Sequence, residues 1–379
     1  MSRIIDCDRH VIEPLEMWQE YADKRVISQY PITFHPDNLE KQTDRFERTG
    51  IDKPLPPIVY LGDFPILSNW DEQQQIASAL IDKKSSGERR RASYPNTQIE
   101  SMDESGVAVA NIFPTFCMYI VNHKDISAES SLGYAQAYNR WLEDYCAYNN
   151  ERLKAVGMVS RHDTSSLVSQ VEDIARRGWK TITLRPEPIL GKTLGHPEYE
   201  AFWDACEAND IGIAFHGGTH LQGTTVGMDR FSTRFNLHAC SHPMEAQMAF
   251  ITLLEAGVLE RHPKLRFLFL EAGCSWVPQW LWRLDNICYD EFPYLTQDAI
   301  KMPPSEYFKR QCWVSVEIGE PMKDALEMIG HERLVYASDY PHPDHLHFDL
   351  HEIANEMPDL SEQQLREILE ENPKSFFKI

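Results

Sequence analysis

The chain has 379 residues, of which 42% are hydrophobic and 25% are charged, an ordinary composition for a soluble globular protein. Its formal net charge of -21 repels nucleic acid and anionic membranes, so we exclude nucleic-acid binding and expect no membrane partner. No stretch approaches the roughly 18 consecutive apolar residues of a spanning helix, and no segment resembles a signal peptide, so we expect a cytoplasmic protein.

Short apolar runs alternate with amphipathic stretches along the chain. The eight runs typical of strands are residues 3–8, 107–114, 153–160, 180–186, 211–217, 265–273, 312–319 and 333–341. Helical patterns lie between them, such as YAQAYNRWLEDYCAYNNERL, SSLVSQVEDIARRG and PMEAQMAFITLLEAGVLERH. Strands that alternate with helices indicate a parallel sheet, and eight of them favour an α/β fold of the (β/α)₈ TIM-barrel type over an open doubly wound sheet. We therefore predict a single barrel domain over residues 1–379.

Residues 25–96 interrupt this alternation after the first strand. The segment is rich in Pro, Asp, Lys and Ser and shows little hydrophobic periodicity. Long connections of this kind inside a compact domain are usually functional or disordered. We predict that residues 25–96 form a lid-like insertion that covers one mouth of the barrel.

Polar side chains stand at the C-terminal ends of the predicted strands, the face that carries barrel active sites. The first strand ends in Asp8 and His10, the fifth in His216 and the eighth in Asp339. Asp8 and His10 are two residues apart, so both side chains lie on one face of the strand. Two imidazoles and two carboxylates suit Zn, Mn or Fe(II) and leave positions open for water and substrate. These four residues predict a divalent metal site.

Each of these residues also has a simpler explanation. A single histidine after a strand is more often a hydrogen-bonded core or loop residue than a ligand. Buried carboxylates are unfavourable unless they are paired or metal-bound, however, and three strand ends carry them here, with Asp8, Asp339 and, after the sixth strand, Glu271. A metal at this position would lower the pKa of bound water and polarise a substrate oxygen. The coincidence therefore favours metal-dependent hydrolysis or lyase chemistry.

Several stretches resemble the amidohydrolase superfamily, specifically the family of 2-amino-3-carboxymuconate-semialdehyde decarboxylase and its metal-dependent hydrolase relatives. The stretches that carry this resemblance include IIDCDRHVIEP, IGIAFHGG, SHPMEAQMAF, RFLFLEAGCSWVPQWLWRLD and LVYASDYPHPD. They run from one end of the chain to the other and leave mainly residues 25–96 uncovered. The resemblance implies that the family's metal ligands fall on Asp8, His10, His216 and Asp339, and that Asp339 also transfers a proton.

One position departs from the family pattern. Where the decarboxylating members carry a histidine after strand six, this chain has Glu271 within LEAG. Glu271 is a candidate general base that takes a proton from metal-bound water. It is also a candidate ligand that completes a second metal site, and a salt bridge to Arg185 or Arg283 is the structural alternative. The substitution favours hydrolysis over simple decarboxylation.

Other residues near the strand ends are candidates for substrate contacts. Arg185 is expected to clamp a substrate carboxylate, or to form a buried ion pair with an acid of the site. Histidines in the following loops are expected to support the ligands or contact substrate, and His242 is also a catalytic candidate. These histidines are His220, His238, His242 and His342. Trp276 and Phe116, the latter with Tyr119, are candidate apolar walls for an aromatic or polyketide-like acid derivative.

The sequence thus predicts a metal-dependent hydrolase in which Glu271 or Asp339 accepts a proton from water. The hydroxide would attack a carbonyl carbon in an amide, ester, thioester or activated C–C bond of a small, carboxylate-bearing substrate. Two other functions remain open: a non-oxidative decarboxylase of an aromatic or unsaturated acid, and a barrel that binds without catalysis. The expected cofactor is one divalent ion of Zn, Mn or Fe, or two if Glu271 completes a second site. We expect a homodimer from the segment CSWVPQWLWRLD and the family habit.

Overall fold

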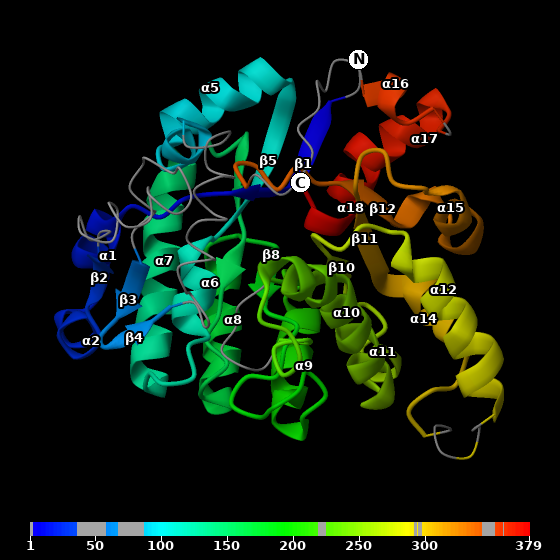
Figure 1. Ribbon diagram of the computed structural model, residues 1–379, viewed down its shortest axis with the longest axis horizontal. Helices are drawn as coiled ribbons and strands as arrows, with labels where there is room; N and C mark the ends of the chain where they lie inside the picture. The colour runs from blue at the N-terminus through cyan, green and yellow to red at the C-terminus, as the bar shows by residue number, and fades with distance from the viewer. Residues whose placement is uncertain are drawn as a thin grey trace, which may run out of the picture.

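The computed structural model describes residues 3–35, 58–66, 87–218, 225–291, 294, 298–342, 353–358 and 360–379. Their centre is a closed ring of parallel strands (Figure 1). In chain order the strands are β1 (Ile4–His10), β5 (Val107–Phe113), β6 (Leu153–Ala155), β7 (Gly157–Met158), β8 (Thr181–Leu184), β9 (Gly212–Phe215), β10 (Phe267–Phe269), β11 (Cys312–Val316) and β12 (Leu334–Tyr336). The ring closes where β1 meets the residues after β12, through the bridge between Arg9 and Tyr340. The predicted TIM barrel is confirmed.

All eight predicted strands are present, although the third is divided. Val156 separates β6 from β7, and its amide donates to the carbonyl of Ile112 at 3.3 Å. β6 pairs with β5, whereas β7 pairs with β8. One strand position of the barrel is therefore shared between two short strands that face different neighbours.

Helices surround the strands on the outside (Figure 1). The main ones are α5 (Pro95–Ser105), α6 (Phe116–Val121), α7 (Ala128–Ala147), α8 (Leu167–Arg176), α9 (Glu200–Ala208), α10 (Arg234–Glu255), α11 (Val258–Arg261), α12 (Trp276–Arg283), α14 (Pro304–Gln311), α15 (Lys323–Ile329), α16 (Ile353–Glu356), α17 (Glu362–Arg366) and α18 (Asn372–Phe377). Most of them bury apolar residues against the barrel, which is why the sequence shows helical periodicity between the strands, whereas α17 has no buried residue.

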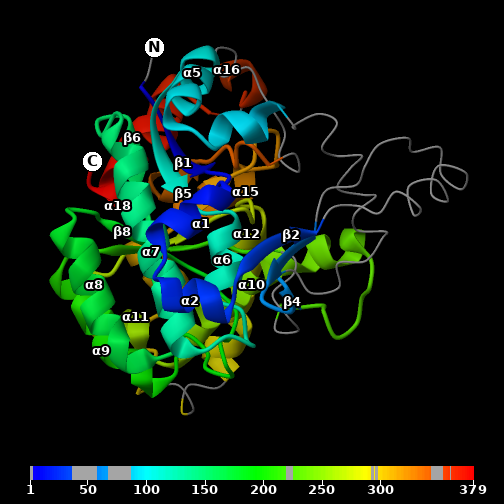
Figure 2. The same cartoon turned by 90° about the vertical axis from the view of Figure 1, so that its left-hand side faces the viewer.

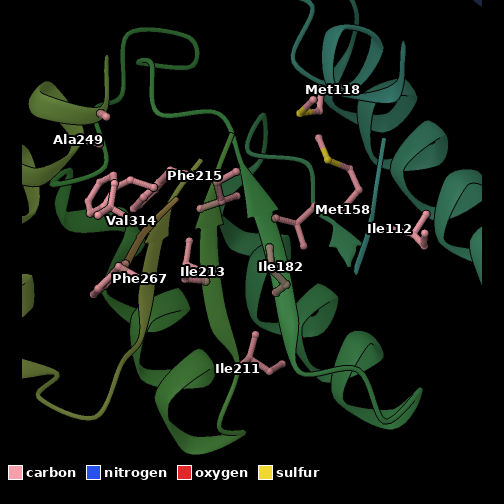
Figure 3. Packing of buried hydrophobic residues seen from close by; sticks show 14 of the residues in the cluster. Ile112, Met118, Met158, Ile182, Ile211, Ile213, Phe215, Ala249, Phe267 and Val314 are labelled. Carbon is pink, nitrogen blue, oxygen red and sulfur yellow. The ribbon is translucent and has the colours of Figure 1, made fainter. Parts of the chain in front are cut away.

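Alternation along the strands divides the core into two clusters. Ile213 and Phe215 of β9 belong to the larger cluster, which fills the space between the strands and the helices (Figure 3). Ala214, between them, belongs to a second cluster with Leu268 of β10 and Val335 of β12. Because successive side chains of a strand point to opposite faces, this second cluster is the filling of the barrel interior.

The described part of residues 25–96 contains more regular structure than its composition indicates. A three-stranded antiparallel sheet is formed by β2 (Ile32–His35), β3 (Ile58–Leu61) and β4 (Phe64–Pro65), with α1 (Leu15–Tyr21) and α2 (Lys24–Gln29) before it (Figure 2). Phe64 packs against His123, with the ring centroids 5.6 Å apart. Residues 36–57 and 67–86 lie outside the described part of the chain. The covering role of this segment stays a prediction.

The helix expected to start at Pro243 begins earlier. α10 starts at Arg234, after Thr233, whose hydroxyl accepts from the amide of Asn236, so Pro243 lies inside the helix. A proline in a helix interior removes one backbone hydrogen bond, and packing of the apolar face of α10 offsets this loss. The sequence-based boundary was wrong because Pro at a helix start is the commoner arrangement. No described helix is long and apolar enough to cross a membrane.

Candidate metal centre

Four side chains from three parts of the sequence meet at the C-terminal end of the barrel. Asp8 and His10 come from β1, His216 directly follows β9, and Asp339 lies three residues beyond β12. One ligand atom from each lies within 4.8 Å of the others, and all four residues are buried. The structure therefore brings together the four residues whose positions at strand ends predicted a metal site.

The atoms of this group face one another closely. The Nε2 atom of His10 lies 3.3 Å from Oδ1 of Asp8 and 3.0 Å from Oδ1 of Asp339. The Nε2 atom of His216 lies 3.3 Å from Oδ2 of Asp8. The two Nε2 atoms are only 2.8 Å apart. Nitrogen and carboxylate oxygen atoms thus converge on one small volume.

Groups outside the cluster fix which ring nitrogen is available. Nδ1 of His10 lies 2.9 Å from the carbonyl oxygen of Pro114, which can only accept a hydrogen bond. Nδ1 of His216 lies 3.1 Å from a carboxylate oxygen of Glu271. Both Nδ1 atoms are therefore assigned as donors, which leaves the Nε2 lone pairs directed into the cluster. A carboxylate or carbonyl behind an imidazole is the usual support of a metal-bound histidine.

A divalent cation fits this donor set. Two Nε2 lone pairs at 2.8 Å repel each other unless a proton or a metal ion lies between or beside them. Neither carboxylate oxygen of Asp8 has a hydrogen-bond partner among the described residues, although both are buried. Burial raises the pKa of Asp8, but the adjacent His216 and His10 outweigh it and lower the pKa to about 2. Two carboxylates and two imidazoles are suitable ligands for Zn, Mn or Fe(II).

The backbone around the centre adopts conformations that side chains other than glycine rarely take. Asp339 has φ 49° and Glu271 has φ 52°, both in the left-handed region. The amide of Asp339 donates to the carbonyl of Asp8 at 2.9 Å, and the amide of His10 donates to the carbonyl of Tyr340 at 2.7 Å. Such conformations persist where the surroundings fix them, and they concentrate at functional sites.

Glu271 lies beside the four-residue group rather than within it. Its Oε2 atom is 3.1 Å from Nδ1 of His216 and 3.4 Å from Nε2 of His242. Nδ1 of His242 in turn lies 3.0 Å from the hydroxyl of Ser241. Glu271 thus connects a predicted ligand with a second imidazole from α10. Its role as a metal ligand stays a prediction.

Arg185 forms the ion pair that was the alternative to a substrate clamp, but its partner is not one of the predicted acids. The guanidinium binds both carboxylate oxygens of Glu187, and the two side chains are fully buried.

Trp276 packs in the apolar layer outside the barrel, with its ring 5.8 Å from that of Phe269 and 6.2 Å from that of Phe308. The structure does not bring Trp276 to the four-residue group. His220 lies outside the described residues.

Two other predicted contacts, His342 and Phe116, lie in segments that follow barrel strands, and only His342 touches a residue of the four-residue group. The ring of His342 packs edge-on against that of His10, with centroids 4.5 Å apart. Phe116 lines a hollow of about 390 Å³ together with Ile12, Leu15 and Phe34. This hollow opens beside the loop that follows His10, and its lining is mainly apolar.

Sequence reasoning missed two residues near the centre. The hydroxyl of Thr115 lies 3.3 Å from Nδ1 of His10 and 3.1 Å from Nε2 of His342. A threonine after a strand carries no signal in one sequence, so only the fold identifies it. Glu187 was detectable in principle, because it stands two residues after Arg185 in LRPEP and so lies on the same side of an extended chain.

Comparisons with known proteins identify the family of this chain. A 2-amino-3-carboxymuconate-6-semialdehyde decarboxylase of Dictyostelium discoideum is 23% identical over 254 residues, which cover 66% of this chain and 67% of the relative. An amidohydrolase structure from Mycobacterium avium subsp. paratuberculosis superposes with a TM-score of 0.76 at 19% identity and covers 99% of both chains. A 5-carboxyvanillate decarboxylase from Novosphingobium aromaticivorans, complexed with manganese and 4-hydroxy-3-methoxy-5-nitrobenzoic acid, gives a TM-score of 0.70 at 17% identity, covering 100% of this chain and 96% of that one. Residues 5–379 match the family described as Amidohydrolase, so the chain belongs to the amidohydrolase family.

Proposed function

We propose that the protein is a metal-dependent, non-oxidative decarboxylase of an aromatic acid. The observation that carries the proposal is the buried group of Asp8, His10, His216 and Asp339 with a third imidazole, that of His242, beside Glu271. The relatives add support, because proteins of this fold and family include decarboxylases of a carboxymuconate semialdehyde and of 5-carboxyvanillate. This proposal differs from the hydrolase expected from the sequence.

The four clustered residues would hold the ion. A bound divalent cation supplies positive charge that orients a substrate carboxylate and a neighbouring oxygen. Manganese is the first metal to test, because the structure of the 5-carboxyvanillate decarboxylase contains it. Zinc and iron remain the other candidates, since the ligand types suit all three.

Decarboxylation also needs a proton at the ring carbon. The bond between this carbon and the carboxylate breaks, CO₂ leaves, and the electron pair that remains on the carbon takes up a proton. Nε2 of His242 lies 3.4 Å from Oε2 of Glu271, so this pair is our candidate proton donor, and solvent would return the proton afterwards. Loss of the family histidine after strand six is then compensated by an imidazole from α10.

The hollow beside the loop that follows His10 is our candidate for holding the rest of such a substrate, with Glu13, Glu16 and Ser93 in its wall as well as apolar side chains. Ile12, which follows His10 by two residues, lines the hollow together with Phe34 and Phe116. A ring buried against such walls is held by apolar contact, while its carboxylate faces the ion. His342 beside His10 is a further candidate contact.

Hydrolysis remains the second candidate because of Glu271. Glu271 lies two residues beyond β10 and is the carboxylate next to the four-residue group, 3.1 Å from Nδ1 of His216, so it would be the candidate to accept a proton from water in the site. The hydroxide would then attack a carbonyl carbon. An amide or ester of an aromatic acid would be the corresponding substrate class.

Release of CO₂ distinguishes decarboxylation from hydrolysis. Manganese-loaded protein is incubated with 5-carboxyvanillate and hydroxybenzoates labelled with ¹³C in the carboxyl group, and with matched aryl amides and esters. We expect labelled CO₂ from the acids, and none with the Asp339→Asn variant. Turnover of amides or esters without CO₂ release would identify a hydrolase, and wild-type protein without stoichiometric metal would contradict both reactions.

The oligomeric state is a separate proposal. Trp282 on α12 is 53% exposed, whereas Trp276 is buried, so one tryptophan of this segment is available to a partner. We propose a homodimer, which light scattering tests directly.

A further inference from the structure

A buried ion pair supports the backbone that follows His216. The Nε atom of Arg185 donates to Oε2 of Glu187 at 3.0 Å, and Nη2 donates to Oε1. The same guanidinium donates through Nη1 to the carbonyl of Gly217 and through Nη2 to the carbonyl of Gly218 at 2.9 Å. Four of the five N–H donors of the guanidinium are thus used within the protein. Only one N–H donor is left for a substrate carboxylate.

The two glycines explain how the guanidinium comes so close to this backbone. A Cβ atom on Gly218, which has φ 153°, would lie 2.0 Å from Nη1 of Arg185 and 2.7 Å from the hydroxyl oxygen of Tyr119. A Cβ atom on Gly217 would lie 3.1 Å from Cδ2 of His242. The HGG sequence therefore lets Arg185 and His242 pack directly against the chain after His216.

Glu187 also binds the far side of the same connection. Its Oε1 atom accepts from the hydroxyl of Thr225 at 2.9 Å. Thr225 is the first described residue after Gly218. Glu187 thus holds one described end of the connection directly and the other through Arg185.

We propose that Arg185 and Glu187 are positioning residues of the metal centre. By fixing the carbonyls of Gly217 and Gly218, they fix the main chain next to His216 and hence the direction of its imidazole. The inference rests on the metal site of the proposed function, but it does not depend on which reaction the site catalyses. Outer partners of this kind typically change metal affinity by about 10- to 100-fold when removed.

A matched ion pair at the other end of β9 provides the control. Arg266 binds the side chain of Asp210 and donates to its carbonyl at 3.0 Å, just before β9 begins. Asp210→Asn and Glu187→Gln each convert a carboxylate bound by arginine into an amide. Only the second change lies at the end that carries His216.

The test is a Co²⁺ titration of metal-free protein, followed by the visible absorption of the bound ion. We expect Glu187→Gln and Arg185→Lys to weaken Co²⁺ binding by about 10- to 100-fold and to change the absorption bands, which report ligand geometry. Asp210→Asn should leave the Co²⁺ affinity within twofold of wild type and the absorption bands unchanged. Circular dichroism and a thermal melt verify that each variant is folded.

The outcomes separate the two proposals. Folded Glu187→Gln and Arg185→Lys proteins with wild-type affinity and spectrum would overturn the positioning role. If these variants do not fold, Thr225→Val is the deciding variant. It removes the hydrogen bond from the Thr225 hydroxyl to Glu187 and leaves the buried ion pair of Arg185 and Glu187 intact. A smaller change in the same direction supports the inference, and an unchanged spectrum overturns it. Wild-type protein that binds Co²⁺ but releases no CO₂ refutes only the proposed reaction, whereas failure to bind Co²⁺ refutes both.

Discussion

An ion pair between an arginine and a carboxylate lies near each end of strand β9, one exposed to solvent and the other buried. At its start, Arg266 pairs with Asp210, whose side chain is 53% exposed. At its end, Arg185 pairs with Glu187, and both side chains are 0% exposed. Solvent screens the first pair, so its contribution to stability is small. The second pair has no such screening, so each charge depends on its partner.

The histidines near these two ends differ in the same way. His262 lies before β10 and contacts Glu200 at 3.2 Å, a carboxylate that is 40% exposed. His216 lies after β9, between the buried carboxylates of Asp8 and Glu271. His262 is itself buried, but the three carboxylates within 4.0 Å of it, those of Glu200, Asp204 and Glu207, all reach solvent. The carboxylate of Asp8 beside His216 is 0% exposed, which makes His216 the ligand candidate. Burial and convergence, more than residue type, distinguish the functional end of the barrel.

The largest expected effect comes from removing one histidine at each end. Loss of a residue that supports a metal ligand weakens metal binding by up to about 100-fold. His216→Ala removes a ligand itself, so it should weaken Mn²⁺ binding by more than this and abolish turnover. His262→Ala should retain Mn²⁺, because His262 has no place in the cluster. Metal analysis after gel filtration measures both, and equal metal content in the two variants would contradict the assigned site.

Glu271→Gln tests the residue that connects the centre with His242. We expect kcat to fall by about 10²- to 10⁴-fold, the usual contribution of a general acid or base, with metal content unchanged. The amide still accepts from His216 but no longer transfers a proton. If wild type holds two equivalents of metal and this variant, or Glu271→Ala, holds one, Glu271 is a ligand of a second ion instead.

Two glycine substitutions separate a steric clash from backbone strain. Gly218→Ala brings a Cβ atom to 2.0 Å from Arg185, whereas Gly178→Ala, before β8, meets no atom within 4 Å despite φ 77°. We expect Gly178→Ala to cost only the backbone strain of about 1–2 kcal/mol in the free energy of unfolding. Gly218→Ala should also weaken metal binding, because the guanidinium must move. Denaturant unfolding and Co²⁺ titration separate these effects, and matching metal affinities would remove the link between Gly218 and the centre.

The smallest effect is a difference in pH dependence between two glutamates. Burial, and then the charge of Glu187, raise the pKa of Glu245 to about 8. In the unfolded chain a glutamate ionises near pH 4.3, so the stability associated with protonated Glu245 is lost between about pH 4 and about pH 8. Glu245→Gln should therefore flatten the fall in unfolding free energy over this range.

Glu200 at the other end should show the opposite sign. Its hydrogen bond with Arg261 lowers the pKa of Glu200, so its contribution is present above the unfolded pKa and is lost as pH falls through the folded value. Urea unfolding from pH 3 to pH 9 compares Glu245→Gln with Glu200→Gln. The same sign for both variants would contradict the difference between the two ends.

The strands and the polar residues that follow them were predictable from the amino-acid sequence. Alternating apolar runs predicted all eight barrel strands, because a strand buried on both faces needs continuous apolar side chains. Since parallel strands all end on one face of a barrel, Asp8, His10, His216 and Asp339 were predictable as neighbours despite their distance along the chain. These inferences rest on periodicity and strand direction, which are local properties.

The tertiary structure alone decided which partner each side chain takes. The sequence left Arg185 either as a substrate clamp or in a buried ion pair, and the fold shows the ion pair, with Glu187. Trp276, predicted as a pocket wall, packs against Phe308. Sequence reasoning also began a helix at Pro243, which lies inside α10 and thereby brings His242 to Glu271. Partner choice depends on burial and on contacts between segments far apart in sequence, and neither is written in the local pattern. Spacing therefore located the centre, while packing around β9 determined how its residues are held.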